Sequence, residues 1–249
     1  MQPQLSYLIC ATPRTGSTLL CESLMNTGLA GYPEEYFSPD AEDTFHRSLG
    51  VSTFKPFLEK VLEEKTTPNG VFGAKVKMPE FFPYFIRKLK ETDAEAESLS
   101  DADLLSQTFP NLHYVWITRR SKVRQAVSLL KAIQTSVWKT RSVKPQKTPQ
   151  EPLQYVFDGI DLLVQRIVTH EAIWQEFFDR YDIRPFMVVY EDFVNDYEGT
   201  ARRILDYLGV RVTGDLRGGQ RVLMRQADGL SDEWVERYLR EKSELMMKA

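Results

Sequence analysis

The sequence 5-LSYLICATPRTGSTLLCESLMN-26 decides the fold of this chain. Its first part, residues 5–11, is apolar and contains tyrosine and isoleucine, which favour extended structure, so it predicts a β-strand. The chain then turns through residues 12–18 and continues with leucines at helical spacing, which end before Gly28. We therefore expect a strand, a tight turn and a helix in direct succession.

The turn between this strand and helix has the composition of an anion-binding loop. Backbone N–H groups at a helix N-terminus and the helix dipole point at the same place, and Arg14 adds a full positive charge. An ordinary turn capped by Thr15 or Ser17 would give the same local pattern. A Walker A loop has a lysine after its second glycine, but Ser17 follows Gly16 here. The sequence therefore argues against a magnesium-dependent NTPase.

The composition is that of a globular protein whose attraction for anions is local. A length of 249 residues suits one α/β domain, and we expect residues 1–249 to form a single domain. The net charge of −3 argues against a nucleic-acid partner. Cys10 and Cys21 make no disulfide framework, as is typical of a cytoplasmic protein. We expect neither a signal peptide nor a membrane span, because no apolar run is long enough.

Strands and helices alternate along the rest of the chain. Strands are expected at 71–78, 112–118 and, as a buried strand, 185–190, and helices at 54–64, 81–89, 104–109, 121–140, 157–181, 191–208 and 231–247. The buried stripe of the helix after the third strand is expected to consist of Val123, Val127, Leu130, Ile133 and Val137. The alternation predicts an α/β fold with a central, mostly parallel sheet and helices on both faces. The anion loop then lies at the carboxyl edge of the sheet, where ligands of such folds bind.

Several segments resemble one family. Residues 13–18, PRTGST, resemble the 5′-phosphosulfate loop of sulfotransferases that use 3′-phosphoadenosine 5′-phosphosulfate (PAPS). Residues 31–37, GYPEEYF, are similar to a Gly-x-Pro-x-Glu-aromatic-Phe segment of the bacterial trehalose sulfotransferase family, and 134–138 and 225–238 resemble later segments of it. The resemblance implies a P-loop-like three-layer fold. It also implies a cytoplasmic enzyme that moves the sulfuryl group of PAPS to a carbohydrate hydroxyl, as a possible homodimer.

The resemblance assigns the donor site to two places in the chain and a late loop. Arginine offers a forked donor and serine a hydroxyl, which suits a second phosphate, and Ser128 stands eight residues after Arg120 and nine after Arg119. Both spacings occur for the 3′-phosphate of PAPS, so the choice between the two arginines stays open. The loop that contains Arg225 is expected to close over the nucleotide. The residues expected to bind PAPS, or its product PAP, are Arg14, Thr15, Gly16, Ser17, Thr18, Arg119, Arg120, Ser128 and Arg225.

The base that activates the acceptor is expected to be Glu35. It matches the family's glutamate, whereas the three histidines, at 46, 113 and 170, lie outside the family's catalytic segment. Partial desolvation by Tyr36 and Phe37 is expected to raise the pKa of Glu35 toward a useful range. Glu34 is the alternative base. Arg14 is expected to stabilise the charge that develops on the bridging oxygen.

The acceptor side is expected to contain Glu35, Tyr36, Gln134 and Trp138, because carboxylates, amides and aromatic faces suit a sugar. Trehalose or a related glycoside is the acceptor that the resemblance implies. Lys75 either faces this site or lines the end of its strand.

Two other classes of function remain open at this point. One is a P-loop-like kinase, which the missing Walker lysine opposes. The other is a module that binds PAP without chemistry, which Glu35 opposes. No metal is expected, because no His, Cys and Asp residues stand at ligand spacing.

Overall fold

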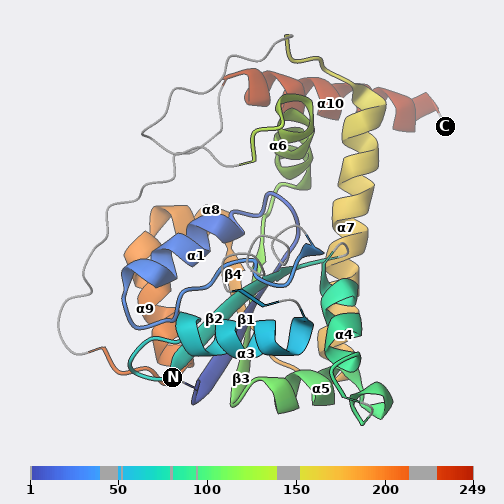
Figure 1. Cartoon of the computed structure of the whole chain (residues 1–249). Helices are drawn as coiled ribbons and strands as arrows, with labels where there is room; N and C mark the ends of the chain where they lie inside the picture. Colours follow the sequence, from blue (N-terminus) through green and yellow to red (C-terminus); the bar gives the residue numbers. More distant parts are fainter. Residues whose placement is uncertain are drawn as a thin grey trace.

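The chain folds into three layers around a parallel sheet, as predicted (Figure 1). The computed structural model describes residues 2–39, 50–51, 53–78, 81–93, 95–138, 152–212 and 229–248. Within these residues the strands are β1 (Leu5–Ala11), β2 (Val71–Lys77), β3 (Leu112–Thr118) and β4 (Phe186–Val189). They pair in parallel in the order β2-β1-β3-β4. The carboxyl end of β1 therefore lies between those of β2 and β3.

Helices follow the strands and cover both faces of the sheet (Figure 1). In chain order they are α1 (Ser17–Asn26), α3 (Phe54–Lys65), α4 (Phe82–Lys90), the short 3-10 helix η1 (Ala96–Ser98), α5 (Asp101–Thr108), α6 (Lys122–Thr135), α7 (Phe157–Arg180), α8 (Tyr190–Asn195), α9 (Tyr197–Tyr207) and α10 (Gly229–Lys248).

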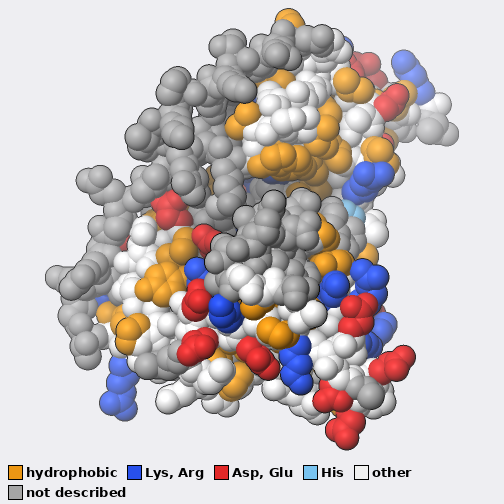
Figure 2. All heavy atoms as spheres, in the orientation of Figure 1, with side chains coloured by type: hydrophobic (Ala, Val, Ile, Leu, Met, Phe, Trp, Pro, Cys, Tyr) orange, Lys and Arg blue, Asp and Glu red, His pale blue; other side chains and the backbone are white. Residues whose placement is uncertain are grey.

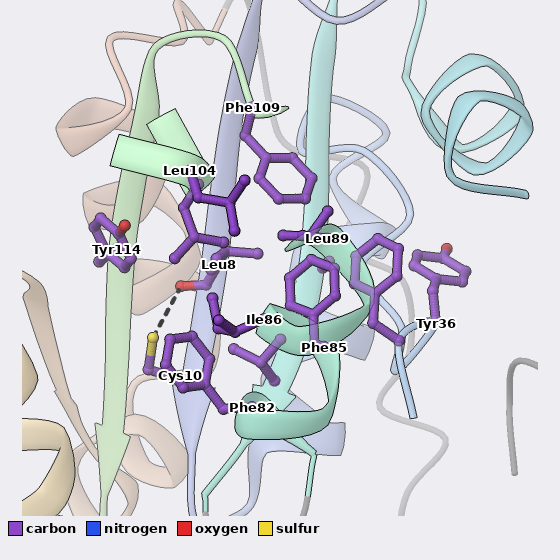
Figure 3. Packing of buried hydrophobic residues seen from close by; sticks show 14 of the residues in the cluster. Leu8, Cys10, Tyr36, Phe82, Phe85, Ile86, Leu89, Leu104, Phe109 and Tyr114 are labelled. Carbon is purple, nitrogen blue, oxygen red and sulfur yellow. Dashed lines mark hydrogen bonds between the residues drawn. The ribbon is translucent and has the colours of Figure 1, made fainter. Parts of the chain in front are cut away.

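The two faces of the sheet build two separate hydrophobic clusters, because successive side chains of a strand point to opposite faces. On β1, Leu8 and Cys10 belong to a cluster with α3, α4, α5 and the last part of α7. Tyr7, Ile9 and Ala11 belong to the cluster formed with α1 and α9. Figure 3 shows part of the first cluster, where side chains of α4 pack toward β1. The sheet is thus buried on both faces, as a parallel sheet must be.

A third cluster joins α6, α7 and α10 into a helical lobe beyond the carboxyl edge of the sheet (Figure 1). Hydrophobic side chains gather on the outside of this lobe (Figure 2), and the exposed ones include Ile133 of α6 and Leu162 of α7. α6 begins at Lys122, shortly after β3 ends at Thr118.

Three predictions about these elements are wrong. The helix expected at 121–140 is α6, which ends at Thr135, so Val137 of the expected buried stripe lies beyond the helix. Ile133, expected in the buried stripe of its helix, is 51% exposed, because the buried face of α6 is formed by residues such as Ala126, Leu129 and Leu130. The expected buried strand at 185–190 is β4, whose Met187 is 49% exposed because β4 is an outer strand of the sheet.

In the part of the chain that the structure describes, no helix is both long and apolar enough to cross a membrane.

Candidate functional site

The predicted anion loop connects β1 to α1 at the carboxyl edge of the sheet, and buried side chains hold it from within. Thr15 is fully buried, and its Oγ1 donates a hydrogen bond to the carbonyl oxygen of Thr12 at 3.0 Å. Gln125 of α6, also fully buried, donates through Nε2 to Thr12 Oγ1 at 2.9 Å and to the carbonyl oxygen of Pro13 at 2.7 Å. No side chain caps the N-terminus of α1. The first-turn N–H groups of α1 therefore remain to bind an anion.

Gly16 is required here for two reasons. Its φ of 88° lies in the left-handed region, which glycine adopts without strain. A Cβ at this position would come within 2.4 Å of the ring of Tyr190. The loop can thus turn sharply against Tyr190 only because Gly16 has no side chain.

Arg14 joins the anion loop to α6. Its Nε donates to Ser128 Oγ at 3.0 Å, and its Nη1 donates to the backbone carbonyl oxygen of Trp138 at 2.7 Å. Burial and the neighbouring charge of Arg119 lower the pKa of Arg14 below its ordinary value. The structure therefore brings together three residues that the sequence assigned to the donor: Arg14, Ser128 and Arg119.

The two arginines at the end of β3 have different surroundings. The guanidinium of Arg119 lies 4.7 Å from the ring centroid of Tyr190, and its Nε lies 3.5 Å from a carboxylate oxygen of Glu191. The Arg119 side chain is 12% exposed, whereas that of Arg120 is 59% exposed. Arg120 Nη2 donates to both carboxylate oxygens of Asp192, at 2.6 and 2.5 Å. Arg119 thus faces the anion loop, and Arg120 is engaged on the outer surface.

Glu35 lies between two lysines of β2. Its Oε2 is 2.9 Å from Lys75 Nζ and its Oε1 is 2.8 Å from Lys77 Nζ. Lys75 Nζ also donates to Thr18 Oγ1, in the first turn of α1, at 3.3 Å. The predicted base is therefore linked to the anion loop through one buried lysine.

The backbone that carries Glu35 is fixed to the outer edge of the sheet. Glu34 forms an isolated parallel bridge with Ala74 of β2, and the N–H of Lys75 donates to the carbonyl oxygen of Glu34 at 2.8 Å. A Cβ at Gly31, whose φ is 69°, would come within 2.8 Å of the backbone nitrogen of Gly73. The segment thus runs close against β2, and this contact aims Glu35 at the two lysines.

The expected pKa of Glu35 needs correction. Burial alone raises the pKa, as predicted, but the charges of Lys75 and Lys77 and their hydrogen bonds outweigh it and hold the pKa below its usual range. The prediction considered only the aromatic residues next to Glu35 in the sequence. It did not include Lys75 and Lys77, which the fold places beside Glu35. Glu35 is therefore an ionised carboxylate at neutral pH.

Two of the residues expected to contact the acceptor have other partners. Tyr36 is fully buried, its ring is stacked on Phe72 with centroids 6.4 Å apart, and its hydroxyl donates to the carbonyl oxygen of Tyr32. In this arrangement Tyr36 packs in the core, and its contact with the acceptor stays a prediction. Gln134 uses both ends of its amide on the backbone of Gln154, at 2.8 and 2.9 Å.

The remaining predicted residues differ in exposure, and one lies outside the described part of the chain. Trp138 is 53% exposed, and its side chain is accessible beside the carbonyl group that binds Arg14. Ser17 is buried at the start of α1. Arg225 lies outside the described residues, so its assigned role stays a prediction.

Sequence reasoning missed two contributors to the site. Gln125 belongs to no recognisable motif. It supports the anion loop through a contact between α6 and Thr12, more than a hundred residues earlier in the chain. Lys77, which pairs with Glu35, was not assigned to the site from the sequence. The alternation of the two lysines was the available signal, since it places both on one face of β2.

Two further features bear on the chemistry. Among the described residues, no three His, Cys, Asp or Glu side chains are grouped so that they could hold a metal ion. A cavity of about 760 Å³ lies between α4 and α7, where it is lined by Phe82, Ile86, Ile173 and Phe177 among others, and it contains none of the predicted site residues.

Comparison with known proteins finds related sequences and a similar fold. The sequence model of the Stf0 sulphotransferase family matches residues 6–241. A trehalose 2-sulfotransferase of Mycolicibacterium smegmatis is 31% identical over 95% of both chains, and one of Mycobacterium tuberculosis is 29% identical over 96% of both. The crystal structure of a sulfotransferase from Alicyclobacillus acidocaldarius, 13% identical, superposes with a TM-score of 0.50 over 96% of this chain and 92% of that one. The last similarity concerns the fold alone.

Proposed function

Because the chain belongs to the Stf0 sulfotransferase family, we propose that it transfers the sulfuryl group of PAPS to a hydroxyl of a carbohydrate. The observation that carries this proposal is the contact chain from Glu35 through Lys75 to Thr18, which places a carboxylate beside an anion loop. A transfer enzyme needs both parts, an anion site for the donor and a base for the acceptor. A module that only binds PAP would need no carboxylate at this place.

The donor is held by the anion loop and the end of β3. The first-turn N–H groups of α1 and Arg14 bind the 5′-phosphosulfate, and Ser128 binds the 3′-phosphate. We assign the guanidinium at the 3′-phosphate to Arg119, because Arg120 already donates two hydrogen bonds to Asp192. Arg225 is proposed to complete the donor site.

Glu35 acts as the general base in this proposal. As the acceptor oxygen bonds to sulfur, Glu35 takes the hydroxyl proton, and the bond between sulfur and the bridging oxygen breaks in line with the attack. The charge that remains on the bridging oxygen is stabilised by Arg14 and by the N-terminus of α1. The cations of the protein supply the positive charge at each of these positions, so the proposal includes no metal ion.

The acceptor is proposed to be trehalose or a related glycoside, because both curated relatives are trehalose 2-sulfotransferases. The exposed indole of Trp138 offers an aromatic face to a sugar, and Glu35 offers a carboxylate. A cytoplasmic location and a homodimer, both implied by the family resemblance, stay predictions.

The acceptor is tested by incubating the protein with labelled PAPS and a panel of trehalose, other disaccharides, glycolipids and simple phenols. We expect label on trehalose or a related glycoside, both with and without a metal chelator, and none on phenols. Transfer to phenols with none to any carbohydrate would contradict the acceptor class. If chelation abolishes transfer and magnesium alone restores it, the proposal that protein cations supply the positive charge is contradicted.

Donor binding is tested separately by calorimetry. We expect PAP to bind tightly and ATP weakly, and Arg14→Ala to weaken PAP binding by about 1.5–3 kcal/mol, the range for a hydrogen bond to a charged group. Arg14→Lys is the matched control, because it keeps the charge and the same strained backbone position, whose φ is 65°. The same titration compares Arg119→Ala with Arg120→Ala, of which the first should weaken PAP more. Equal affinity for PAP and ATP in the unmodified protein would contradict the donor assignment.

A further inference from the structure

The peptide bond between Arg119 and Arg120 is held from both sides. Its carbonyl oxygen, which belongs to Arg119, accepts a hydrogen bond from Lys122 Nζ. Its N–H, which belongs to Arg120, donates to a carboxylate oxygen of Glu191 at 3.0 Å. Because a peptide unit is planar, hydrogen bonds at its two opposite ends fix its orientation. The backbone is therefore fixed at the two arginines between which the sequence could not choose.

The ammonium group of Lys122 is tied to α7 at the same time. It donates to Thr118 Oγ1 at 2.9 Å and to Glu171 Oε1 at 2.8 Å, and Glu171 Oε2 lies 2.6 Å away. Thr118 Oγ1 itself donates to Glu171 Oε1 at 2.7 Å. An ammonium group has three N–H donors, and Lys122 has three partners for them: Thr118, Glu171 and the carbonyl group of Arg119. The position of this carbonyl group is thus linked to α7.

Glu191 divides its carboxylate between the two arginines. Its Oε2 accepts the N–H of Arg120, and its Oε1 lies 3.5 Å from Nε of Arg119. The next residue of α8, Asp192, accepts two hydrogen bonds from the guanidinium of Arg120. Two adjacent acids of α8 therefore hold the two arginine side chains apart, with Arg119 toward the anion loop and Arg120 on the surface.

The charge of Glu191 argues against a direct contact with the donor. A carboxylate repels a phosphate group, and Glu191 lies beside the arginine proposed to bind one. Its presence is explained by its two contacts with Arg119 and Arg120, which a neutral side chain of similar size would make less strongly.

We propose that Lys122 and Glu191 are positioning residues, which hold the peptide between the two arginines so that Arg119 and not Arg120 meets the 3′-phosphate of the donor. This inference rests on the proposed sulfotransferase function. Neither residue contacts the donor, since both act through Arg119. When either hydrogen bond is lost, the backbone at Arg119 gains freedom, and donor binding must then provide the cost of ordering it.

Glu191→Gln tests the inference by the sign of its effect. Removing a negative charge near an anion site would tighten donor binding if charge alone mattered, whereas a loss of positioning weakens it. Calorimetry with PAP and with adenosine 5′-monophosphate, which lacks the 3′-phosphate, measures the effect. We expect PAP to bind about 5- to 30-fold more weakly, a part of the roughly 10- to 100-fold that a hydrogen bond to a charged group contributes. Binding of adenosine 5′-monophosphate should not change.

Asp192→Asn is the matched control. It removes the adjacent negative charge and loosens Arg120, but it leaves both hydrogen bonds of the peptide in place. We expect its preference for PAP over adenosine 5′-monophosphate to equal that of the unmodified protein. Unchanged or tighter PAP binding by folded Glu191→Gln, an equal loss for both nucleotides, or the same loss of preference in Asp192→Asn would overturn the inference.

Lys122→Met gives an independent test, which also serves if Glu191→Gln does not fold. This variant removes a cation, so a double-mutant cycle with Arg119→Ala separates positioning from the loss of charge. If Lys122 acts through Arg119, the double variant should bind PAP about as weakly as Arg119→Ala alone. Additive losses would overturn the inference. Failure of the unmodified protein to bind PAP, or of Arg119→Ala to weaken PAP, would instead overturn the proposed donor site, so the two failures are distinguishable.

Discussion

Replacing Glu35 by glutamine is expected to lower kcat by about 10²- to 10⁴-fold, the contribution of a positioned general base. Glutamine keeps the size of the side chain but cannot take the proton of the acceptor. The carboxylate is ionised at neutral pH, because Lys75 and Lys77 outweigh the effect of burial on its pKa. Steady-state transfer from PAPS to the acceptor found in the panel measures the effect.

Glu34→Gln is the matched control, because Glu34 is the adjacent acid and its side chain is exposed. It should keep turnover close to that of the unmodified protein. PAP binding should survive in Glu35→Gln, because Arg14 and the anion loop remain. Near-normal turnover of Glu35→Gln together with its loss in Glu34→Gln would move the base to Glu34.

Trp174→Ala is expected to have the largest effect on stability, lowering the free energy of unfolding by about 3–5 kcal/mol, as large-to-small changes of core aromatic residues do. Trp174 is fully buried, and its ring is stacked on Phe178 with centroids 5.6 Å apart. Its Nε1 donates to the carbonyl oxygen of Ala11, the last residue of β1, at 3.0 Å. Urea denaturation followed by circular dichroism gives the change.

Trp174→Phe separates packing from the hydrogen bond. It keeps a six-membered aromatic ring and loses the N–H donor with the rest of the indole, while Ala11 still accepts a hydrogen bond from the N–H of Met78 at 3.1 Å. The loss should be nearer 1 kcal/mol, the net value of a typical hydrogen bond plus a small packing defect. Equal losses in the two variants would show that the ring volume contributes little.

Local patterns in the sequence predicted most of the fold. The first strand, the helix that begins at Ser17 and the glycine that follows that helix were all predicted, because each depends on residues close together in the chain. The errors come from tertiary contacts. The exposure of Ile133 depends on how α6 packs against α7 and α10, and that of Met187 on the place of β4 in the sheet order. Neither can be obtained from periodicity.

The candidate site was predictable in its parts but not in its contacts. Motif residues such as Arg14 and Ser128 were named from the sequence, and the structure joins them by a hydrogen bond at 3.0 Å. The surroundings of Glu35 were not predictable, because both lysines that lower its pKa come from a strand about forty residues later in the chain. The burial of Tyr36 was not predictable either, since an aromatic residue beside a catalytic segment can face the core as readily as a ligand.

The attachment of Glu34 to β2 has a consequence for solubility. β2 is an outer strand, and the backbone groups of an uncovered outer strand can pair with another chain and start aggregation. Glu34 occupies part of this edge, through its bridge to Ala74 and its hydrogen bond from the N–H of Lys75 at 2.8 Å. Remodelling residues 31–34 to change the acceptor preference is therefore expected to expose unpaired backbone groups of β2 and to promote aggregation. Light scattering of such variants measures the aggregation. Variants with a rebuilt segment that stay monodisperse would contradict this expectation.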